Sequence, residues 1–345
     1  VCAMIFVTGG TGLVGSHLLL ALLQQNAGVK ALRRKSSNVE KVRKLFRYYT
    51  SIADELFSRI MWVEGDILDI CSLEDHLQDV SLIIHCAALV SFDTGKRAEM
   101  IHNNVEGTAN LVNAALSCGV KKICHVSSNS ALGSAKEGRM VTEETSWIPG
   151  RRNSGYSESK FFSEAEIWRG IEEGLDSVVV NPSIILGPGD WQSSSTLFFP
   201  AVYRGFPFYT RGITGFVDVR DVVDAILLLT RNDNFERLKN RKYLLNAGNL
   251  SYRDFFNQIA DALGKPRPFL YASPLILEIA WRLSFLWAFI TGKPARITRE
   301  AVANSNREIR YDGSKITEKT GFRYRPLSEA IQHTAACFLD ERRPG

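Results

Sequence analysis

The sequence lacks the cysteine patterns that indicate a disulfide framework or a zinc site. Its six cysteines form no C-x-x-C pair and have no zinc-ligand spacing with histidine, so we expect no metal site. Several lie in apolar runs, as Cys86 does after residues 83–85, where a buried free thiol is the ordinary interpretation. Free thiols are typical of a reducing compartment. Because the sequence also shows no signal-peptide pattern, we expect a cytoplasmic protein.

Neither charge of one sign nor a long apolar run dominates the sequence. Lys and Arg number 42 against 37 Asp and Glu, a net charge of +5, whereas a nucleic-acid binder usually shows a stronger basic bias. The most apolar segment, residues 274–291, is interrupted by Glu278 and Arg282 and is shorter than the roughly 20 residues of a spanning helix. We therefore expect no nucleic-acid partner and no stable membrane insertion. The segment is a buried or pocket-covering helix, or it makes peripheral contact with a membrane surface.

The first half of the chain alternates short β-branched runs with helical patterns. The predicted strands are residues 3–8, 29–34, 60–63, 81–86, 122–127 and 177–181. The main predicted helices are residues 12–25, 36–49, 100–117 and 156–171. Apolar strands that alternate with helices form a parallel sheet covered on both faces. The predicted fold class is therefore α/β, a doubly wound parallel sheet of the Rossmann type.

The composition changes after residue 186, where Gly187-Pro188-Gly189 interrupts the chain and aromatic residues become frequent. Shorter helices are predicted at 219–230, 252–263 and 327–338, and brief strands at 242–246 and 308–311. We expect a dinucleotide-binding domain over residues 1–186 and a smaller mixed C-terminal substrate lobe over 187–345. Residues 216–247 return to the core. The lobe should pack over the carboxyl edge of the sheet, where ligands bind in open α/β folds.

A glycine-rich loop follows the first predicted strand directly, with the spacing G-x-x-G-x-x-G rather than G-x-G-x-x-G. Gly9 permits a tight turn, Gly12 lets a pyrophosphate approach the backbone, and Gly15 lets helix and strand pack closely. The N-terminus of the following helix favours an anion. A purely structural turn is the alternative, but the strand–turn–helix context favours a dinucleotide site. Its expected residues are Thr8, Gly9, Thr11, Gly12, Leu13, Val14 and Gly15.

The end of the second predicted strand favours NADP(H) over NAD(H). NAD binders usually place an acidic residue there, whereas NADP binders place an arginine for the 2′-phosphate. Here residues 33–35 are all basic, and no carboxylate precedes residue 40. Arg34 can bind a phosphate bidentately and Lys41 lies further on, in the following predicted helix, although a solvated basic surface is the alternative. Asp66 and Ile67, after the third strand, are expected to flank the adenine.

Tyr156 and Lys160 lie four residues apart at the start of a predicted helix, and so on one face of it. A phenol has a pKa near about 10, and a neighbouring ammonium together with an oxidised nicotinamide favours phenolate and lowers that pKa. The pair alone is a weak signal. Support comes from residues 127–130 (Ser-Ser-Asn-Ser), which place hydroxyls at the carboxyl end of a strand, where one of them can polarise a substrate carbonyl.

The chain resembles the extended branch of the short-chain dehydrogenase/reductase family over nearly its whole length. The resemblance rests on residues 8–15, 65–66, 85–88, 104–108, 126–128, 156–160, 181–183 and 216–221. It implies that Ser128, Tyr156 and Lys160 act in concert, with Gly133 marking Ser128 as the matching hydroxyl. Asn181 is a departure, because many relatives have arginine there. The resemblance also implies a nicotinamide site lined by Ala87, Ala88, Asn104, Pro182 and Ser183.

Within that branch the sequence looks most like the dihydroflavonol-reductase and 3β-hydroxysteroid-dehydrogenase group. The Arg34 and Lys41 pair resembles the way in which such reductases hold the 2′-phosphate, and the aromatic second lobe suggests an apolar or aromatic small-molecule substrate. Relatives often form dimers through helices that would here be residues 100–117 and 156–171, so we expect a homodimer. The residues expected to contact substrate, some of them equally compatible with a core role, are Val90, Phe92, Asn129, Trp191, Phe198 and Phe208.

Three functions follow from these residues. The first is NADP(H)-dependent interconversion of a ketone or aldehyde and an alcohol. The second is an NAD-dependent nucleotide-sugar epimerase or dehydratase, which the basic residues 33–35 disfavour, as does Asn129-Ser130 where dehydratases carry paired acids. The third is a non-catalytic NADP-sensing protein, which need not retain a complete Ser, Tyr and Lys set. His85, which follows a buried strand, is expected to be a hydrogen-bonded core histidine rather than a catalyst.

Overall fold

The computed structural model describes residues 4–91, 94–135, 138–150, 153–291, 302 and 305–342. Its centre is a seven-stranded sheet in the order β10-β6-β5-β4-β1-β2-β3, in which every pairing is parallel. The strands are β1 (Met4–Thr8), β2 (Gly28–Arg33), β3 (Met61–Glu64), β4 (Val80–His85), β5 (Lys122–Val126), β6 (Asp176–Pro182) and β10 (Arg241–Leu245). The six strands predicted for the first half are confirmed, and so is the fold class.

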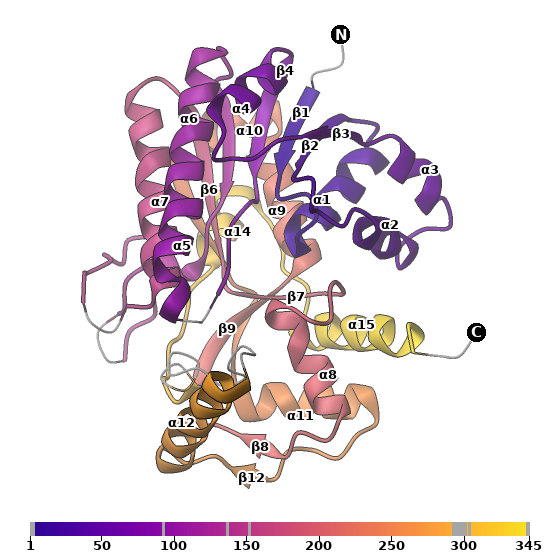
Figure 1. Cartoon of the computed structure of the whole chain (residues 1–345), viewed down its shortest axis with the longest axis vertical. Helices are drawn as coiled ribbons and strands as arrows, with labels where there is room; N and C mark the ends of the chain where they lie inside the picture. The colour runs from indigo at the N-terminus through magenta and orange to yellow at the C-terminus, as the bar shows by residue number, and fades with distance from the viewer. Residues whose placement is uncertain are drawn as a thin grey trace.

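Helices cover both faces of this sheet (Figure 1). One face carries α1 (Leu13–Gln24) and α9 (Val219–Thr230); the other carries α4 (Ile70–Leu77), α6 (Gly107–Ser117) and α7 (Gly155–Glu172). Successive side chains of a strand point to opposite faces. Phe6 and Val7 of β1 are accordingly both fully buried, but in different apolar clusters. Burial on both faces explains why these strands read as continuous apolar runs.

The strand order reverses beside β1. The chain runs from β1 outward through β2 and β3, and then crosses to β4 on the other side of β1. The carboxyl ends of β1, β4 and β5 therefore meet at a topological switch point, the place where open α/β sheets bind their ligands. The glycine loop, the turn after His85 and the serine cluster after Val126 all begin there.

Two predicted helices differ from the observed ones. The helix expected over 36–49 begins only at Glu40, as α2 (Glu40–Arg47), because the Asn38 side chain accepts the Glu40 N–H and a turn precedes it. The helix expected over 100–117 is divided into α5 (Arg97–Ile101), a π-helical turn (His102–Glu106) and α6. Such turns are frequent at functional sites, and this one contains Asn104.

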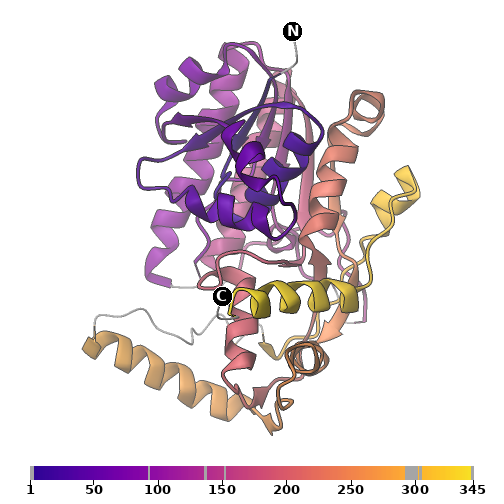
Figure 2. The ribbon, with the colours of Figure 1, turned by 90° about the vertical axis from the view of Figure 1, so that its right-hand side faces the viewer.

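A three-stranded sheet and three helices form the core of the second lobe, which lies at the lower end of the molecule in Figure 2. Its strands are β7 (Ile184–Leu186), β9 (Ile213–Asp218) and β11 (Gly248–Ser251), and its helices are α8 (Phe198–Tyr203), α11 (Tyr252–Leu263) and α15 (Leu327–Asp340). Phe199, Phe216, Phe255 and Phe338 are fully buried between them. The strand predicted at 308–311 is wrong, because that segment makes only isolated bridges, Glu308 to Ile213 and Tyr311 to Val141.

The smaller elements complete the two halves of the molecule. Beside the large sheet lie α3 (Ala53–Ser58), α10 (Asn232–Leu238) and α14 (Ser314–Thr320), and the second lobe adds the short pair β8 (Phe208–Tyr209) and β12 (Leu270–Tyr271). The chain returns from the second lobe to the core through α9, which packs beside α1, and β10, which pairs with β6 at the edge of the sheet.

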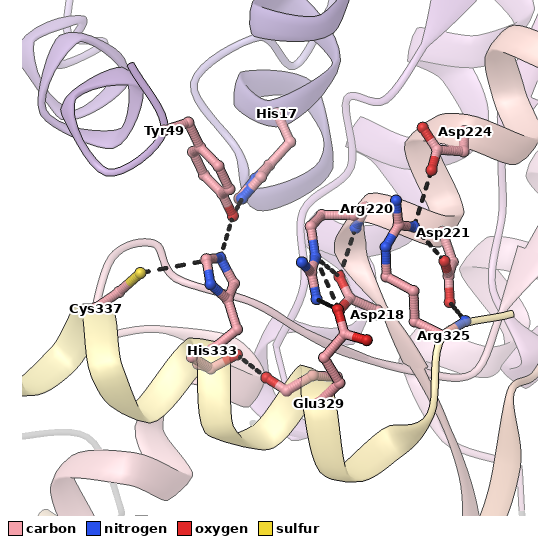
Figure 3. A network of polar contacts seen from close by, with 12 residues as sticks. His17, Tyr49, Asp218, Arg220, Asp221, Asp224, Arg325, Glu329, His333 and Cys337 are labelled. Atoms are coloured by element: carbon pink, nitrogen blue, oxygen red, sulfur yellow. Dashed lines mark hydrogen bonds and ion pairs between the residues drawn. The ribbon is translucent and has the colours of Figure 1, made fainter. Parts of the chain in front are cut away.

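A polar network ties the second lobe to the helices of the first (Figure 3). Arg325, just before α15, makes ion pairs with the fully buried Asp221 and with Asp224 of α9. His17 of α1 and His333 of α15 both hydrogen-bond the hydroxyl of Tyr49, at 2.9 and 3.2 Å. These contacts fix α15 against the half of the molecule that carries the glycine loop.

The apolar segment 274–291 forms one helix, α12 (Pro274–Thr291), that extends away from the second lobe (Figure 2). In its first turns Leu275, Ile276 and Ile279 are exposed, so burial does not account for these residues. Among the described residues, no helix has the length and apolar character needed to cross a membrane.

Candidate active site

The glycine loop is a tight turn in which two positions admit only glycine. Gly9 has a φ of +69°, and a Cβ there would lie 2.5 Å from the Ala87 nitrogen. A Cβ on Gly15 would lie 2.2 Å from the Gly9 oxygen. Gly12 is the N-cap of α1, which has neither a side-chain cap nor an acidic residue in its first turn. The loop therefore presents backbone and a helix N-terminus, the surroundings that suit a pyrophosphate.

A chain of hydrogen bonds holds the ends of β1 and β4 beside this loop. Thr8 Oγ1 lies 2.6 Å from His85 Nδ1, and His85 Nε2 lies 3.0 Å from Thr108 Oγ1. Burial, assisted by the charge of Lys160, lowers the pKa of His85 to about 3. The prediction of a hydrogen-bonded core histidine is thus confirmed, because both ring nitrogens have partners inside the protein.

Asn104 anchors the turn that contains Ala87 and Ala88. Its side-chain amide donates to Leu89 O and accepts from Leu89 N, at 2.9 and 2.7 Å. The same amide donates to Ser159 Oγ of α7 at 3.0 Å. The π-helical turn therefore links this turn to the helix that carries Tyr156 and Lys160.

The structure brings Ser128, Tyr156 and Lys160 together. Ser128 follows β5, and its side chain hydrogen-bonds that of Tyr156 in the first turn of α7. Ser154 caps α7 by accepting the Ser157 N–H, which fixes where the helix begins. Lys160, one turn later, is only 2% exposed and donates from Nζ to Val126 O at 2.9 Å. The three side chains thus meet at the carboxyl end of β5.

Burial changes the pKa values of Tyr156 and Lys160. It raises the pKa of Tyr156, an effect that the hydrogen bond with Ser128 partly offsets. It lowers the pKa of Lys160 to about 8, although the charge of Glu164 acts in the opposite direction. Tyr156 is therefore a neutral phenol at neutral pH, able to donate a proton to an oxygen held by Ser128.

Two residues of the site were missed by the sequence analysis, Glu164 and Tyr311. Glu164 is buried one helical turn beyond Lys160 and accepts a hydrogen bond from Asn181 Nδ2, which also donates to Ser128 O at 3.0 Å. Burial raises the pKa of Glu164. The four-residue spacing from Lys160 was a signal that could have identified it.

Tyr311 reaches the turn of residues 128–131, after β5, from the second lobe. Its side chain hydrogen-bonds Asn129, whose Oδ1 accepts from Ser128 Oγ at 3.2 Å. Tyr311 is held in turn by Asn249, which accepts its N–H at 2.9 Å. No local pattern connects residues 129 and 311, so the sequence carried no signal for this contact.

The expected adenosine-side residues differ in their surroundings. Arg34 is exposed, and its guanidinium has no ion-pair partner in the part of the chain that the structure describes. Lys41 Nζ instead lies 2.7 Å from Asp190 Oδ2. Asp66 accepts the Leu68 N–H at 3.0 Å, and Ile67 packs against Gly107, where a Cβ would lie 2.5 Å from Ile67 Cδ1.

The residues expected to contact substrate are not all brought close to Ser128. Asn129 lies beside Ser128, and Val90 is 44% exposed after the Ala87-Ala88 turn. Phe92 lies outside the described residues. The three aromatic residues of the second lobe pack within it. Trp191 packs on Phe338 and donates to Glu341, Phe198 contacts Phe255 and Phe256, and Phe208 contacts Phe206.

Pro182 and Ser183 lie at the end of β6, on the side of the switch point opposite the glycine loop. Both are buried, and Ser183 donates to Leu245 O from its backbone nitrogen at 3.0 Å and from its hydroxyl at 3.1 Å. Their neighbour Asn181 is bonded to Ser128. They are therefore fixed next to the turn that contains Ser128.

Comparison with known proteins gives matches along most of the chain. Residues 5–243 match the model of the NAD dependent epimerase/dehydratase family. "Putative dihydroflavonol 4-reductase" of Synechocystis sp. (strain ATCC 27184 / PCC 6803 / Kazusa) is 29% identical over 330 residues, 94% of this chain and 92% of that protein. "Sterol demethylase protein B" of Methylococcus capsulatus is 30% identical over 274 residues, 79% and 78% of the two chains.

The fold has solved counterparts as well. DesIV, a dTDP-glucose 4,6-dehydratase from Streptomyces venezuelae crystallised with NAD and TYD, superposes with a TM-score of 0.75 over 98% of each chain. The two sequences are 22% identical, so this likeness supports the fold.

Proposed function

Because the chain belongs to the NAD-dependent epimerase/dehydratase family, we propose that it is an NADP(H)-dependent reductase or dehydrogenase. It interconverts a ketone or aldehyde and an alcohol, on an apolar or aromatic substrate. The family membership confirms the resemblance that the sequence motifs indicate. The observation that carries the proposal is the meeting of Ser128, Tyr156 and Lys160 at the switch point of the sheet.

The residues of the first lobe fit a dinucleotide. Gly9 and Gly15 keep open a space that a Cβ would fill, and the uncapped N-terminus of α1 suits the pyrophosphate. The proposed nicotinamide end is lined by Ala87, Ala88, Asn104, Pro182 and Ser183. When bound, the nicotinamide supplies or accepts the hydride at the carbonyl carbon. Arg34 is the residue that favours NADP(H), because it is an exposed cation without an ion-pair partner in the described chain.

Side chains of the protein carry out the proton transfer. During reduction the Ser128 hydroxyl holds the substrate carbonyl oxygen and the Tyr156 phenol donates its proton to that oxygen, so that an alcohol forms. The Lys160 ammonium stabilises the phenolate left behind. In the reverse direction the phenolate accepts the alcohol proton. Burial of Ser128 and Lys160 strengthens these interactions, because charges interact more strongly inside the protein than in water.

The substrate class and partners belong to the same proposal. An apolar substrate is supported by exposed Val90 beside the Ala87-Ala88 turn and by the names of the two relatives, which refer to a flavonol derivative and a sterol. We propose a homodimer through α6 and α7, where Phe162 is 44% exposed. A cytoplasmic location is supported by the five cysteines in the described part of the chain, all of them free. Exposed Leu275 and Ile279 support peripheral membrane contact by α12.

A carbonyl panel tests the activity. Aromatic and steroid-like ketones and aldehydes are offered with NADPH and with NADH, and sugar nucleotides are offered in parallel, while nicotinamide absorbance is followed. We expect NADPH oxidation with at least one apolar carbonyl compound. Tyr156→Phe should lower kcat by about 10²- to 10⁴-fold, while NADPH binding, measured by its fluorescence, is kept.

Two results would contradict the proposal. An unchanged rate in Tyr156→Phe would remove this residue from the mechanism. Turnover of sugar nucleotides by protein purified with tightly held NAD would instead establish the epimerase or dehydratase function. NADPH binding without turnover of any compound in the panel would favour the sensing function.

A further inference from the structure

One ion pair joins the two lobes at the adenosine end of the proposed cofactor site. Lys41 of α2 and Asp190, in the loop after β7, are 149 residues apart, yet Lys41 Nζ lies 2.7 Å from Asp190 Oδ2. The Lys41 side chain is 51% exposed and that of Asp190 32%. We propose that Asp190 is a cofactor-specificity residue. Its carboxylate holds the Lys41 ammonium in an ion pair until the 2′-phosphate of NADP(H) displaces the carboxylate. This inference rests on the proposed function, since it concerns the same dinucleotide site.

The loop that carries Asp190 lies against the start of α1. A Cβ on Gly189 would be 3.0 Å from Leu13 Cδ1, and a Cβ on Gly187 would be 2.3 Å from Val219 Cγ1 and 3.9 Å from His17. Leu13 is the first residue of the helix on which the pyrophosphate is proposed to rest. Asp190 therefore lies between the start of α1 and Lys41 of α2.

Asp190 is held in place by contacts other than the one with Lys41. Its Oδ1 accepts the Gln192 N–H at 3.1 Å, and its main-chain oxygen accepts from the Thr196 hydroxyl. Burial alone would raise the pKa of the Asp190 carboxyl, but the hydrogen bonds from Lys41 and Gln192 lower it overall. The carboxylate is thus a fixed anion at neutral pH. It would repel a phosphate that approached without displacing it from Lys41.

The two cations proposed for the 2′-phosphate are therefore unequal. Arg34 is exposed without an ion-pair partner in the described residues, whereas the Lys41 ammonium already has a carboxylate. A phosphate bound by both cations must break the Lys41–Asp190 ion pair. That cost lowers the affinity for NADP(H) but not the affinity for NAD(H). NAD(H) has no 2′-phosphate and leaves the pair intact. The Lys41–Asp190 pair consequently sets how strongly the site prefers NADP(H).

Asp190→Asn tests this inference by removing the charge while keeping an oxygen for the Gln192 N–H. Dissociation constants for NADP⁺ and NAD⁺ are measured by calorimetry with the full chain. We expect the constant for NADP⁺ to fall by about 2- to 5-fold, which corresponds to the contribution of a half-exposed ion pair, and the constant for NAD⁺ to remain unchanged. The matched control is Asp233→Asn, which breaks an exposed pair with Arg231 and should change neither constant.

The double variant separates ion-pair exchange from plain repulsion. In the Lys41→Ala background, Asp190→Asn should give a smaller gain in NADP⁺ affinity, because only the repulsion of the phosphate is removed and no cation is released. A gain of the same size there would overturn the exchange, and unchanged or weaker NADP⁺ binding in the single variant would overturn the role of Asp190. If the native chain bound neither dinucleotide, the proposed function itself would fail. Native binding with no effect of Asp190→Asn refutes only this inference.

Discussion

At the scale of single residues, burial moves the pKa values of Tyr156 and Lys160 in opposite directions. It raises that of the phenol and lowers that of the ammonium to about 8. Both shifts have the same origin, because burial disfavours whichever form carries charge. A protonated Tyr156 suits the reduction of a carbonyl group, in which the phenol is the proton donor. The reverse reaction needs the phenolate, which the positive charge of an oxidised nicotinamide would stabilise.

Tyr311 offers a residue-scale test of the contact between the lobes. In Tyr311→Phe, Asn129 loses a hydrogen-bond partner and Ser128 is positioned less firmly. Loss of a supporting hydrogen bond of this kind should lower kcat by about 10-fold. The KM for the cofactor should not change, because Tyr311 contacts the turn that contains Ser128.

Tyr324→Phe is the matched control for this prediction. Tyr324 is a largely buried tyrosine whose hydroxyl donates to Gly313 O at 3.1 Å. Its loss should lower the free energy of unfolding by about 1 kcal/mol and leave kcat unchanged. Equal loss of kcat in the two variants would mean that Tyr311 acts only through stability. Steady-state kinetics and urea unfolding of both variants distinguish these outcomes.

The sequence pointed to Ser128, Tyr156 and Lys160 because their signals are local. Tyr156 and Lys160 share a helix face, and Ser128 ends a strand. It did not predict Tyr311, which depends on how the second lobe packs against the turn after β5. The pairing of Lys41 with Asp190 was missed for the same reason, since the two residues meet only after both lobes have folded.

At the scale of elements, the polar network of Figure 3 holds α15 and the segment before it against α9. Asp221 is fully buried, and it accepts both the Arg325 N–H, at 2.9 Å, and a guanidinium hydrogen bond. Burial raises the pKa of Asp221 even though Arg325 lowers it. The guanidinium of Arg325 is therefore the cation that neutralises the Asp221 carboxylate.

Arg325→Ala should accordingly be costly. It leaves a buried carboxylate without its cation, which is expected to lower the free energy of unfolding by about 3 kcal/mol. The control is Arg310→Ala, which breaks an exposed pair with Glu308 at 3.6 Å and should cost less than about 1 kcal/mol. Guanidinium unfolding of both variants measures the two values. Similar values would show that the Asp221 pair contributes no more than an exposed one.

Among the elements, the strands were predictable and the boundaries of several helices were not. Each central strand is buried on both faces. Its residues are therefore mostly apolar, and the sequence alone shows where the strand lies. The late start of α2 depends on an Asn38 hydrogen bond, and the π-helical turn is associated with the contacts of Asn104 with Leu89 and Ser159. Residues 308–311 have the composition of a strand, but they form isolated bridges only, one to residue 213 and one to residue 141.

At the scale of the whole molecule, three buried histidines link folding to pH. Burial lowers the pKa of His17 to about 4 and that of His85 to about 3, and it lowers that of His125 well below the ordinary value. In the unfolded chain each would titrate near about 6.5. Between that value and about pH 4 the unfolded state therefore binds more protons than the folded state. Stability must then fall as the pH falls through this window.

Buried carboxyls act in the opposite direction. Burial raises the pKa of Glu164 above its ordinary value, so the folded state binds a proton there more readily than the unfolded state and gains stability as the pH falls. Two of the three histidines have folded pKa values of about 4 or lower, and all three charge in the unfolded chain above the range where carboxyls usually titrate. The histidines should therefore dominate between about pH 6.5 and pH 5.

We expect the urea midpoint to decrease from pH 7.5 to pH 5, as measured by circular dichroism in one buffer system at constant ionic strength. His17→Gln should make this decrease smaller, because it removes one of the groups that charge only on unfolding. His102→Gln, a change at an exposed histidine of the π-helical turn, is the control and should leave the decrease as it is. A midpoint that stays constant or rises toward pH 5 would mean that the buried carboxyls outweigh the histidines. The three histidines would then not be the main cause of the change in stability between pH 7.5 and pH 5.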